Sequence, residues 1–123
     1  MAKILIVDDE HDLAEMIRYI LEFKGHEAKS VLNGYKAIEE IKTTHYDLVL
    51  MDIRMPGING VEAFLKIKEI DPSIKVIMMT GFSVDTLIKE AIRQGASGCI
   101  NKPFGPEKLI AAIDTLLNST SPF

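Results

Sequence analysis

The sequence predicts an α/β protein in which five strands alternate with five helices in a doubly wound sandwich. Short apolar runs without alternation occur at residues 3–7, 47–52 and 75–79, as expected of parallel strands covered on both faces. Between the runs, apolar residues recur at helical spacing, and Gly, Pro or Asn mark the ends of the segments. The connections between these elements are only a few residues long, which agrees with this fold class.

The composition indicates one globular domain. The chain has 123 residues, 47% of them hydrophobic and 26% charged, which is enough to bury a core without disulfides. A net charge of -4 without a Lys or Arg cluster argues against direct nucleic-acid binding by this domain. No apolar run approaches the roughly 20 residues that cross a bilayer, the first residues lack signal-peptide features, and Cys99 has no second cysteine to pair with. We therefore expect a cytoplasmic protein that does not bind membranes.

The first half of the chain provides two strands and two helices. Residues 3–7 form a strand that ends in acids, and a helix follows from Asp12 until Gly25 stops it. Residues 26–32 alternate only in part, which is typical of a strand at the sheet edge. Asn33 can cap the second helix, whose apolar positions are Ala37, Ile38 and Ile41.

The central strand, residues 47–52, ends in Asp52, and Pro56 and Gly57 soon follow it. Asn59 and Glu62 have the spacing of a capping box and predict a helix to about Ile70.

The last part of the chain repeats the pattern. A strand at residues 75–79 precedes Thr80 and Gly81, and Ser83 can cap a helix that ends near Arg93. A shorter strand at residues 97–101 leads to the last helix, with Pro106 in its first turn. We expect the domain to span residues 1–117, with residues 118–123 as a polar tail or the start of a linker.

Polar side chains stand directly after four of the apolar runs. They are Asp8 and Asp9, Asp52, Thr80 and Lys102. In open parallel sheets, ligands bind beyond the carboxyl ends of the strands, so these groups are expected to share one pocket. Three converging carboxylates would repel one another unless a cation neutralised them, and Mg²⁺ prefers such oxygen ligands. His11 next to the acids is interpreted as an exposed residue of the first helical turn rather than a ligand.

The same groups suit phosphoryl transfer. A lysine, a hydroxyl and a divalent ion can neutralise and position a phosphoryl group, and a carboxylate can act as the nucleophile. Asp52 is the best candidate for the nucleophile, because it stands alone on the central strand while Asp8 and Asp9 are paired.

These residues resemble the signature of the response regulator receiver domains of two-component signalling. The matching motifs are Asp8-Asp9, Asp52 with Met55-Pro56-Gly57 and Gly60, Thr80-Gly81, and Lys102-Pro103-Phe104. The resemblance covers residues 3–117 and implies a flavodoxin-like fold, a doubly wound (βα)5 sandwich with strand order 2-1-3-4-5.

The resemblance also implies the roles of the site residues. Asp52 would accept phosphate from a histidine of a sensor kinase or phosphotransferase. Asp9 and Asp52 would bind Mg²⁺ directly and Asp8 through water, with the backbone carbonyl of Arg54 as a further ligand. Lys102 would pair with the phosphoryl oxygens and Thr80 would move toward them. The protein would then be a switch rather than an enzyme, acting on an unidentified output domain or protein, with a phosphorylation-dependent homodimer left open.

Four positions bear on the relay of the switch or on the lifetime of the phosphoryl group. The family usually has Tyr or Phe where this chain has Cys99, which we interpret as a small buried residue. Phe82, or movement of the helix that Ser83 begins, is our hypothesis for the relay. Arg54 and Phe82 are both large and flank the phosphate site in this family, so we expect a phosphoryl group that persists.

Two alternatives remain. A haloacid-dehalogenase-like phosphatase also uses a strand-end Asp as nucleophile with Mg²⁺. Such an enzyme requires a second Asp two residues later as general acid, where this chain has Arg54. A degenerate receiver that serves only as a protein interaction module is the other alternative, and the complete set of site residues speaks against it.

Overall fold

The computed structural model describes residues 2–81 and 85–118. The strands are β1 (Lys3–Val7), β2 (Glu27–Val31), β3 (Leu48–Asp52), β4 (Lys75–Thr80) and β5 (Gly98–Asn101). They alternate with α1 (His11–Phe23), α2 (Gly34–Thr43), α3 (Gly60–Ile70), α4 (Asp85–Arg93) and α5 (Pro106–Asn118). All strand pairs are parallel and the order is β2-β1-β3-β4-β5, which confirms the predicted topology.

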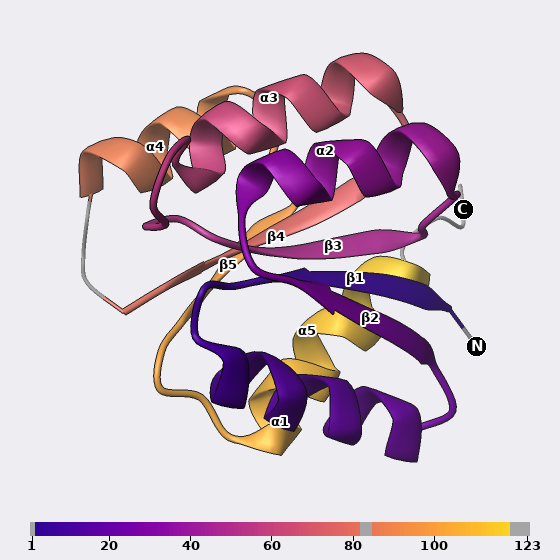
Figure 1. Ribbon diagram of the computed structural model, residues 1–123. Helices are drawn as coiled ribbons and strands as arrows, with labels where there is room; N and C mark the ends of the chain where they lie inside the picture. Colours follow the sequence, from indigo (N-terminus) through magenta and orange to yellow (C-terminus); the bar gives the residue numbers. More distant parts are fainter. Residues whose placement is uncertain (1, 82–84, 119–123) are drawn as a thin grey trace.

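The helices cover both faces of the sheet, with α2, α3 and α4 on one side and α1 and α5 on the other (Figure 1). Successive side chains of a strand point to opposite faces, so each central strand contributes side chains to two cores. The first core lies under α2, α3 and α4, and the second lies under α1 and α5. On β3, for example, Val49 and Met51 pack in the first core, while Leu48 and Leu50 pack in the second. This burial on both faces explains why the central strands are continuously apolar.

The edge strands differ from the central ones. β2 has an alternating burial pattern and lies at one edge, as expected from its mixed sequence. β5 lies at the other edge and begins at Gly98, one residue later than predicted. The interpretation of Cys99 as a buried residue is wrong, because its side chain is exposed. Its neighbour Ile100 points into the core beside α5, whereas Cys99 points to the opposite face, which is incompletely covered at this edge.

Local signals set the helix boundaries. The side chain of Asn33 accepts a hydrogen bond from the backbone N–H of Lys36, which confirms the predicted cap of α2. α1 begins at His11, one residue before the expected start, and Gly25 follows its end with a φ of 91°, in the left-handed region that favours glycine. The predicted cap Ser83 lies outside the described residues.

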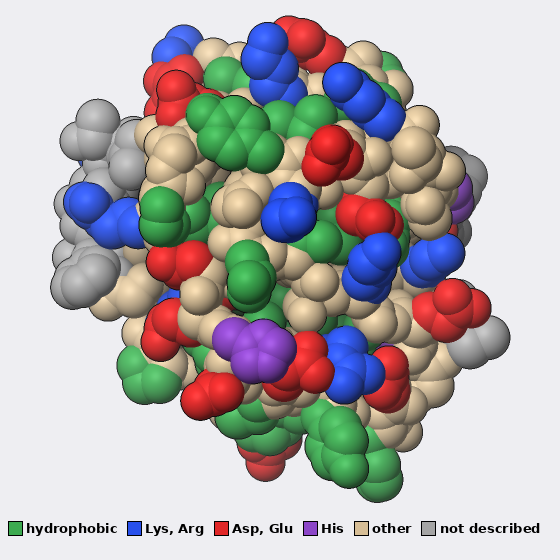
Figure 2. Space-filling model, viewed as in Figure 1, with side chains coloured by type: hydrophobic (Ala, Val, Ile, Leu, Met, Phe, Trp, Pro, Cys, Tyr) green, Lys and Arg blue, Asp and Glu red, His purple; other side chains and the backbone are tan. Residues whose placement is uncertain are grey.

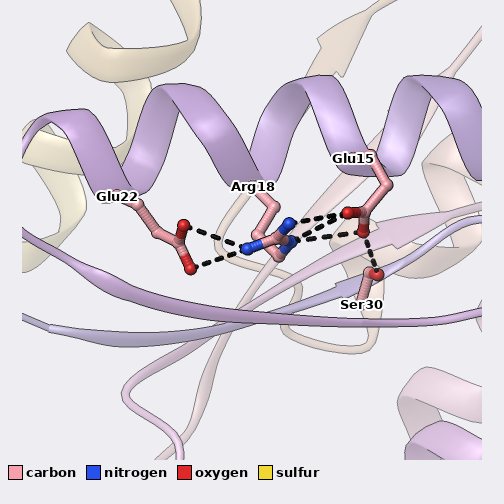
Figure 3. A network of polar contacts seen from close by, with 4 residues as sticks. All are labelled: Glu15, Arg18, Glu22 and Ser30. Carbon is pink, nitrogen blue, oxygen red and sulfur yellow. Dashed lines mark hydrogen bonds and ion pairs between the residues drawn. The ribbon is translucent and has the colours of Figure 1, made fainter.

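An ion-pair network joins α1 to β2 (Figure 3). The guanidinium of Arg18 lies between the carboxylates of Glu15 and Glu22, at 2.7 and 2.9 Å. The hydroxyl of Ser30 on β2 donates to Glu15 at 3.0 Å. The hydrogen bond from Arg18 lowers the pKa of Glu15. This network fixes the outer side of α1 against the edge of the sheet.

Within the described residues, none of the helices has the length and apolar character needed to cross a membrane.

Candidate phosphoacceptor and metal site

The predicted site residues meet at the carboxyl edge of the sheet, on the left of Figure 1. Asp8 follows β1, Asp52 ends β3, Thr80 ends β4 and Lys102 follows β5. Because parallel strands all end at the same edge, four segments that are distant in sequence deliver their polar groups to one place.

Lys102 lies among the carboxylates. Its Nζ donates to Asp8 Oδ2 at 2.8 Å and lies 3.5 Å from Asp52 Oδ1. The side chain is only 13% exposed and that of Asp8 is fully buried, so both charges have left water and depend on each other. Burial alone would lower the pKa of Lys102, but the hydrogen bond to Asp8 and the charge of Asp52 outweigh it, and the pKa is raised.

Asp52 is the perturbed acid of the site. Burial raises its pKa, and the nearby charge of Asp8 raises it further, to about 6, against the opposing effect of Lys102. The carboxyl is therefore mostly ionised at neutral pH, although its ionised form is less favourable here than in water. Such a group is a candidate for a functional role, since perturbed pKa values concentrate at functional sites.

Three carboxylates form a cluster that can hold a metal ion. One oxygen from each of Asp8, Asp9 and Asp52 lies within 4.8 Å of the others. Asp8 and Asp52 are buried and Asp9 is exposed, so one side of the cluster faces solvent. Hard oxygen ligands with access for water suit Mg²⁺, which keeps part of its hydration shell. The donor set therefore fits the predicted ion.

The loop between β3 and α3 lies close against the backbone of Asp52. The N–H of Gly60 donates to the carbonyl of Ile53 at 2.7 Å, and a Cβ on Gly60 would lie 2.2 Å from the backbone oxygen of Asp52. Asn59 and Glu62 form the predicted capping box, with both bonds at 3.0 Å. The close approach at residue 60 requires glycine, and it turns the chain directly after the acid.

A backbone hydrogen bond links the ends of β4 and β5. The N–H of Lys102 donates to the carbonyl of Thr80 at 2.6 Å, and the side chain of Thr80 is buried. This hydrogen bond holds the backbone after β5 against the end of β4.

The sequence did not single out Glu10 as a member of the site. Its Oε1 lies 3.7 Å from Lys102 Nζ, and its backbone N–H donates to Asp8 Oδ1 at 2.9 Å. Its position directly after the acid pair was the only signal. Arg54 is exposed two residues after Asp52, and His11 is exposed at the start of α1, as expected. Phe82 lies outside the described residues.

The fold and the site together define a class of protein. It is a doubly wound α/β domain with a pocket of carboxylates and one lysine at the carboxyl ends of its strands. The family model of the response regulator receiver domain matches residues 4–114. The chain therefore belongs to the response regulator receiver family, the phosphoacceptor modules of two-component systems.

Relatives and solved structures agree with this assignment. The chemotaxis protein CheY of Thermotoga maritima is 37% identical over 113 residues, covering 91% of this chain and 94% of the relative. Sporulation initiation phosphotransferase F of Bacillus subtilis is 32% identical, covering 94% and 93%. The crystal structure of a CheY-like receiver domain protein from Methanospirillum hungatei has a TM-score of 0.93 at 30% identity and covers 96% of this chain and 94% of its own.

Proposed function

We propose that Asp52 accepts a phosphoryl group from a phosphohistidine of a sensor kinase or histidine phosphotransferase. The single observation that carries the proposal is the convergence of Asp8, Asp9, Asp52 and Lys102 on one pocket. In the transfer, a carboxylate oxygen of Asp52 forms the new bond to phosphorus while the bond from phosphorus to the donor nitrogen breaks.

The chain's own residues supply position and charge. Asp8, Asp9, Asp52 and the carbonyl of Arg54 would hold Mg²⁺, which supplies positive charge to the transferred group when bound. Asp52 is ionised at neutral pH and can attack, since its pKa of about 6 lies below that pH. Lys102 can contact the phosphoryl oxygens because its Nζ already lies 3.5 Å from Asp52.

The output is a shifted conformational equilibrium rather than a released product, so the protein acts as a signalling module. A phosphoryl group adds nearly two negative charges and competes with Asp8 for Lys102. The hydrogen bond between Lys102 and Thr80 supports transmission of that change to the end of β4, from which Thr80 would approach the phosphoryl group. The proposed setting is the cytoplasm, with residues 1–117 as the receiver unit, residues 118–123 as tail or linker, and an unidentified output domain or protein as target.

Phosphorylation by acetyl phosphate tests the proposal. Intact-mass spectrometry is expected to show one added phosphoryl group in the presence of Mg²⁺ and none after EDTA. Asp52→Asn should stay unmodified. Asp47→Asn should react like the parent, because Asp47 precedes the first residue of the same strand, at the end away from Asp52. Labelling of Asp52→Asn would place the acceptor elsewhere, and an unmodified parent would favour the degenerate receiver. Sizing before and after labelling shows whether a dimer forms.

A further inference from the structure

A groove runs between the second half of α1 and the first half of α5, away from the carboxylate pocket. Its volume is about 800 Å³, and its apolar lining comes from Tyr19, Ile20 and Phe23 on α1 and from Pro106, Ile110 and Ala111 on α5. None of the carboxylates of the pocket, nor Lys102, lines this groove. Asp8 and Asp9 precede α1, and twelve helical steps of 1.5 Å place Phe23 about 18 Å beyond the first residue of the helix. The groove is thus separate from the phosphoacceptor site and independent of its chemistry.

Two aromatic side chains of α1 face water beside this groove. Tyr19 is 76% exposed and Phe23 is 88% exposed, although the core already takes up the opposite face of the helix through Ala14, Ile17 and Leu21. In Figure 2, hydrophobic side chains project at the lower edge of the molecule, over this part of α1. Tyr19 and Phe23 are four residues apart and form one ridge. Exposed aromatics that border an apolar groove indicate an interaction surface.

The exposure of these walls favours a protein partner over a small molecule. A small-molecule site encloses most of its ligand and buries its own lining residues. Here the two largest side chains, Tyr19 and Phe23, are exposed, so a protein segment that lies along the groove would cover them better than a small molecule would. A groove between two helices accepts a third helix, whose side chains fill the space between the ridges.

The charges along α5 specify the partner further. Glu107 and Asp114 both line the groove, and within the described part of the chain neither has a cation within 4 Å. They are seven residues apart, so they lie two turns apart on one side of α5, about 10 Å from each other. On the α1 side of the groove, Glu22 is already paired with Arg18, and Lys24 also lines the groove. The α5 wall of the groove therefore carries two negative charges at helical spacing, and they outnumber the one positive charge that Lys24 brings to the lining.

We propose that this groove binds an amphipathic helix of a partner protein, with an apolar stripe and two Lys or Arg residues seven positions apart on one flank. The apolar stripe would cover Tyr19, Phe23 and Ile110, and the two cations would face Glu107 and Asp114. A second copy of this chain is a poor occupant, because a two-fold interface would place the acidic walls near each other in a protein with a net charge of -4.

Synthetic helical peptides test this proposal. One peptide carries a leucine stripe with a Lys pair at positions i and i+7, and the other carries Glu at the same two positions with an equal net charge restored elsewhere. A single Trp in each peptide reports binding by fluorescence, because the protein has no tryptophan. The Lys-pair peptide is expected to bind at least tenfold more tightly than the Glu-pair peptide.

Matched variants assign the binding to the groove. Glu107→Lys combined with Asp114→Lys should abolish or reverse the preference, whereas Glu39→Lys combined with Glu69→Lys changes the net charge equally on exposed positions of α2 and α3 and should leave it intact. Phe23→Ser should weaken binding at least tenfold, and Ile92→Ser, an exposed apolar residue of α4, should not.

Three results would overturn the proposal. They are equal binding of the two peptides, an equal loss of preference in the Glu39 and Glu69 control, and a dimer in sedimentation that Phe23→Ser dissociates. Phosphorylation by acetyl phosphate in the Phe23→Ser variant should match the parent, so that failure of this proposal is distinguishable from failure of the phosphoacceptor site.

Discussion

Lys102 and Asp8 are separated by 94 positions in the chain, yet the lysine Nζ donates to the carboxylate at 2.8 Å. The same ammonium lies 3.5 Å from Asp52, so one cation is shared by two buried acids. Three carboxylates and one lysine leave an excess of negative charge in the pocket. This imbalance makes the metal-free site costly to fold and ready to bind a cation.

Replacing Asp52 with Asn is expected to stabilise the metal-free protein at neutral pH. The folded pKa of about 6 exceeds the ordinary value of 3.8, so the folded state binds more protons than the unfolded state between these values. Stability therefore falls as pH rises through this window, at a cost of up to about 3 kcal/mol. Urea unfolding at pH 7 should show Asp52→Asn to be the more stable protein by on the order of 1–3 kcal/mol.

Two controls accompany this measurement. The advantage of Asp52→Asn should disappear near pH 4, where the parent carboxyl is protonated in the folded state. Mg²⁺ should raise the stability of the parent more than that of the variant, since the variant lacks one carboxylate ligand. An advantage that persists unchanged at acid pH would contradict the role of charge.

Replacing Lys102 with Met is expected to destabilise the protein by about 3 kcal/mol at pH 7, because the fully buried Asp8 loses its charged partner. Denaturant unfolding measures the loss. Lys66→Met on the exposed side of α3 should change stability by less than about 0.5 kcal/mol. If both variants were equally stable, the pair of Lys102 and Asp8 would contribute nothing to the fold.

Adding a methyl group at Gly60 should disturb both the fold and the acceptor. Its Cβ would lie 2.2 Å from the Asp52 carbonyl oxygen, so the backbone behind the acid must move. We expect Gly60→Ala to lose about 1–3 kcal/mol in thermal or urea unfolding and to be labelled more slowly by acetyl phosphate. Gly98→Ala is the matched control, since a Cβ there meets nothing within 4 Å. Normal labelling of Gly60→Ala would show that Asp52 tolerates the shift.

Truncating Arg54 should shorten the lifetime of the phosphoryl group. Its long side chain follows Asp52 by two residues and is expected to restrict the approach of water. Decay of the labelled protein should be several-fold faster in Arg54→Ala than in the parent, and unchanged in Arg93→Ala on α4. Phe82→Ala tests the second shielding residue expected from the sequence. Decay at the parental rate in both Arg54→Ala and Phe82→Ala would exclude shielding.

The sequence by itself determined the order of the elements and the candidate site. Continuous apolar runs predicted central strands because both of their faces are buried, and the acids and lysine after those runs predicted a common pocket, since parallel strands end at one edge. Local signals such as Asn59 with Glu62 were sufficient for helix starts, because a cap needs only residues three positions apart.

Only the tertiary structure decided the features that depend on contacts between distant segments. It placed Glu10 beside Lys102, and it exposed Cys99 because an edge strand is covered incompletely. It also opened the groove between α1 and α5, whose apolar residues show ordinary helical spacing in the sequence. A periodic pattern shows that a residue is apolar and on which side of its element it lies. Whether another segment covers that side depends on how the helices pack on the sheet.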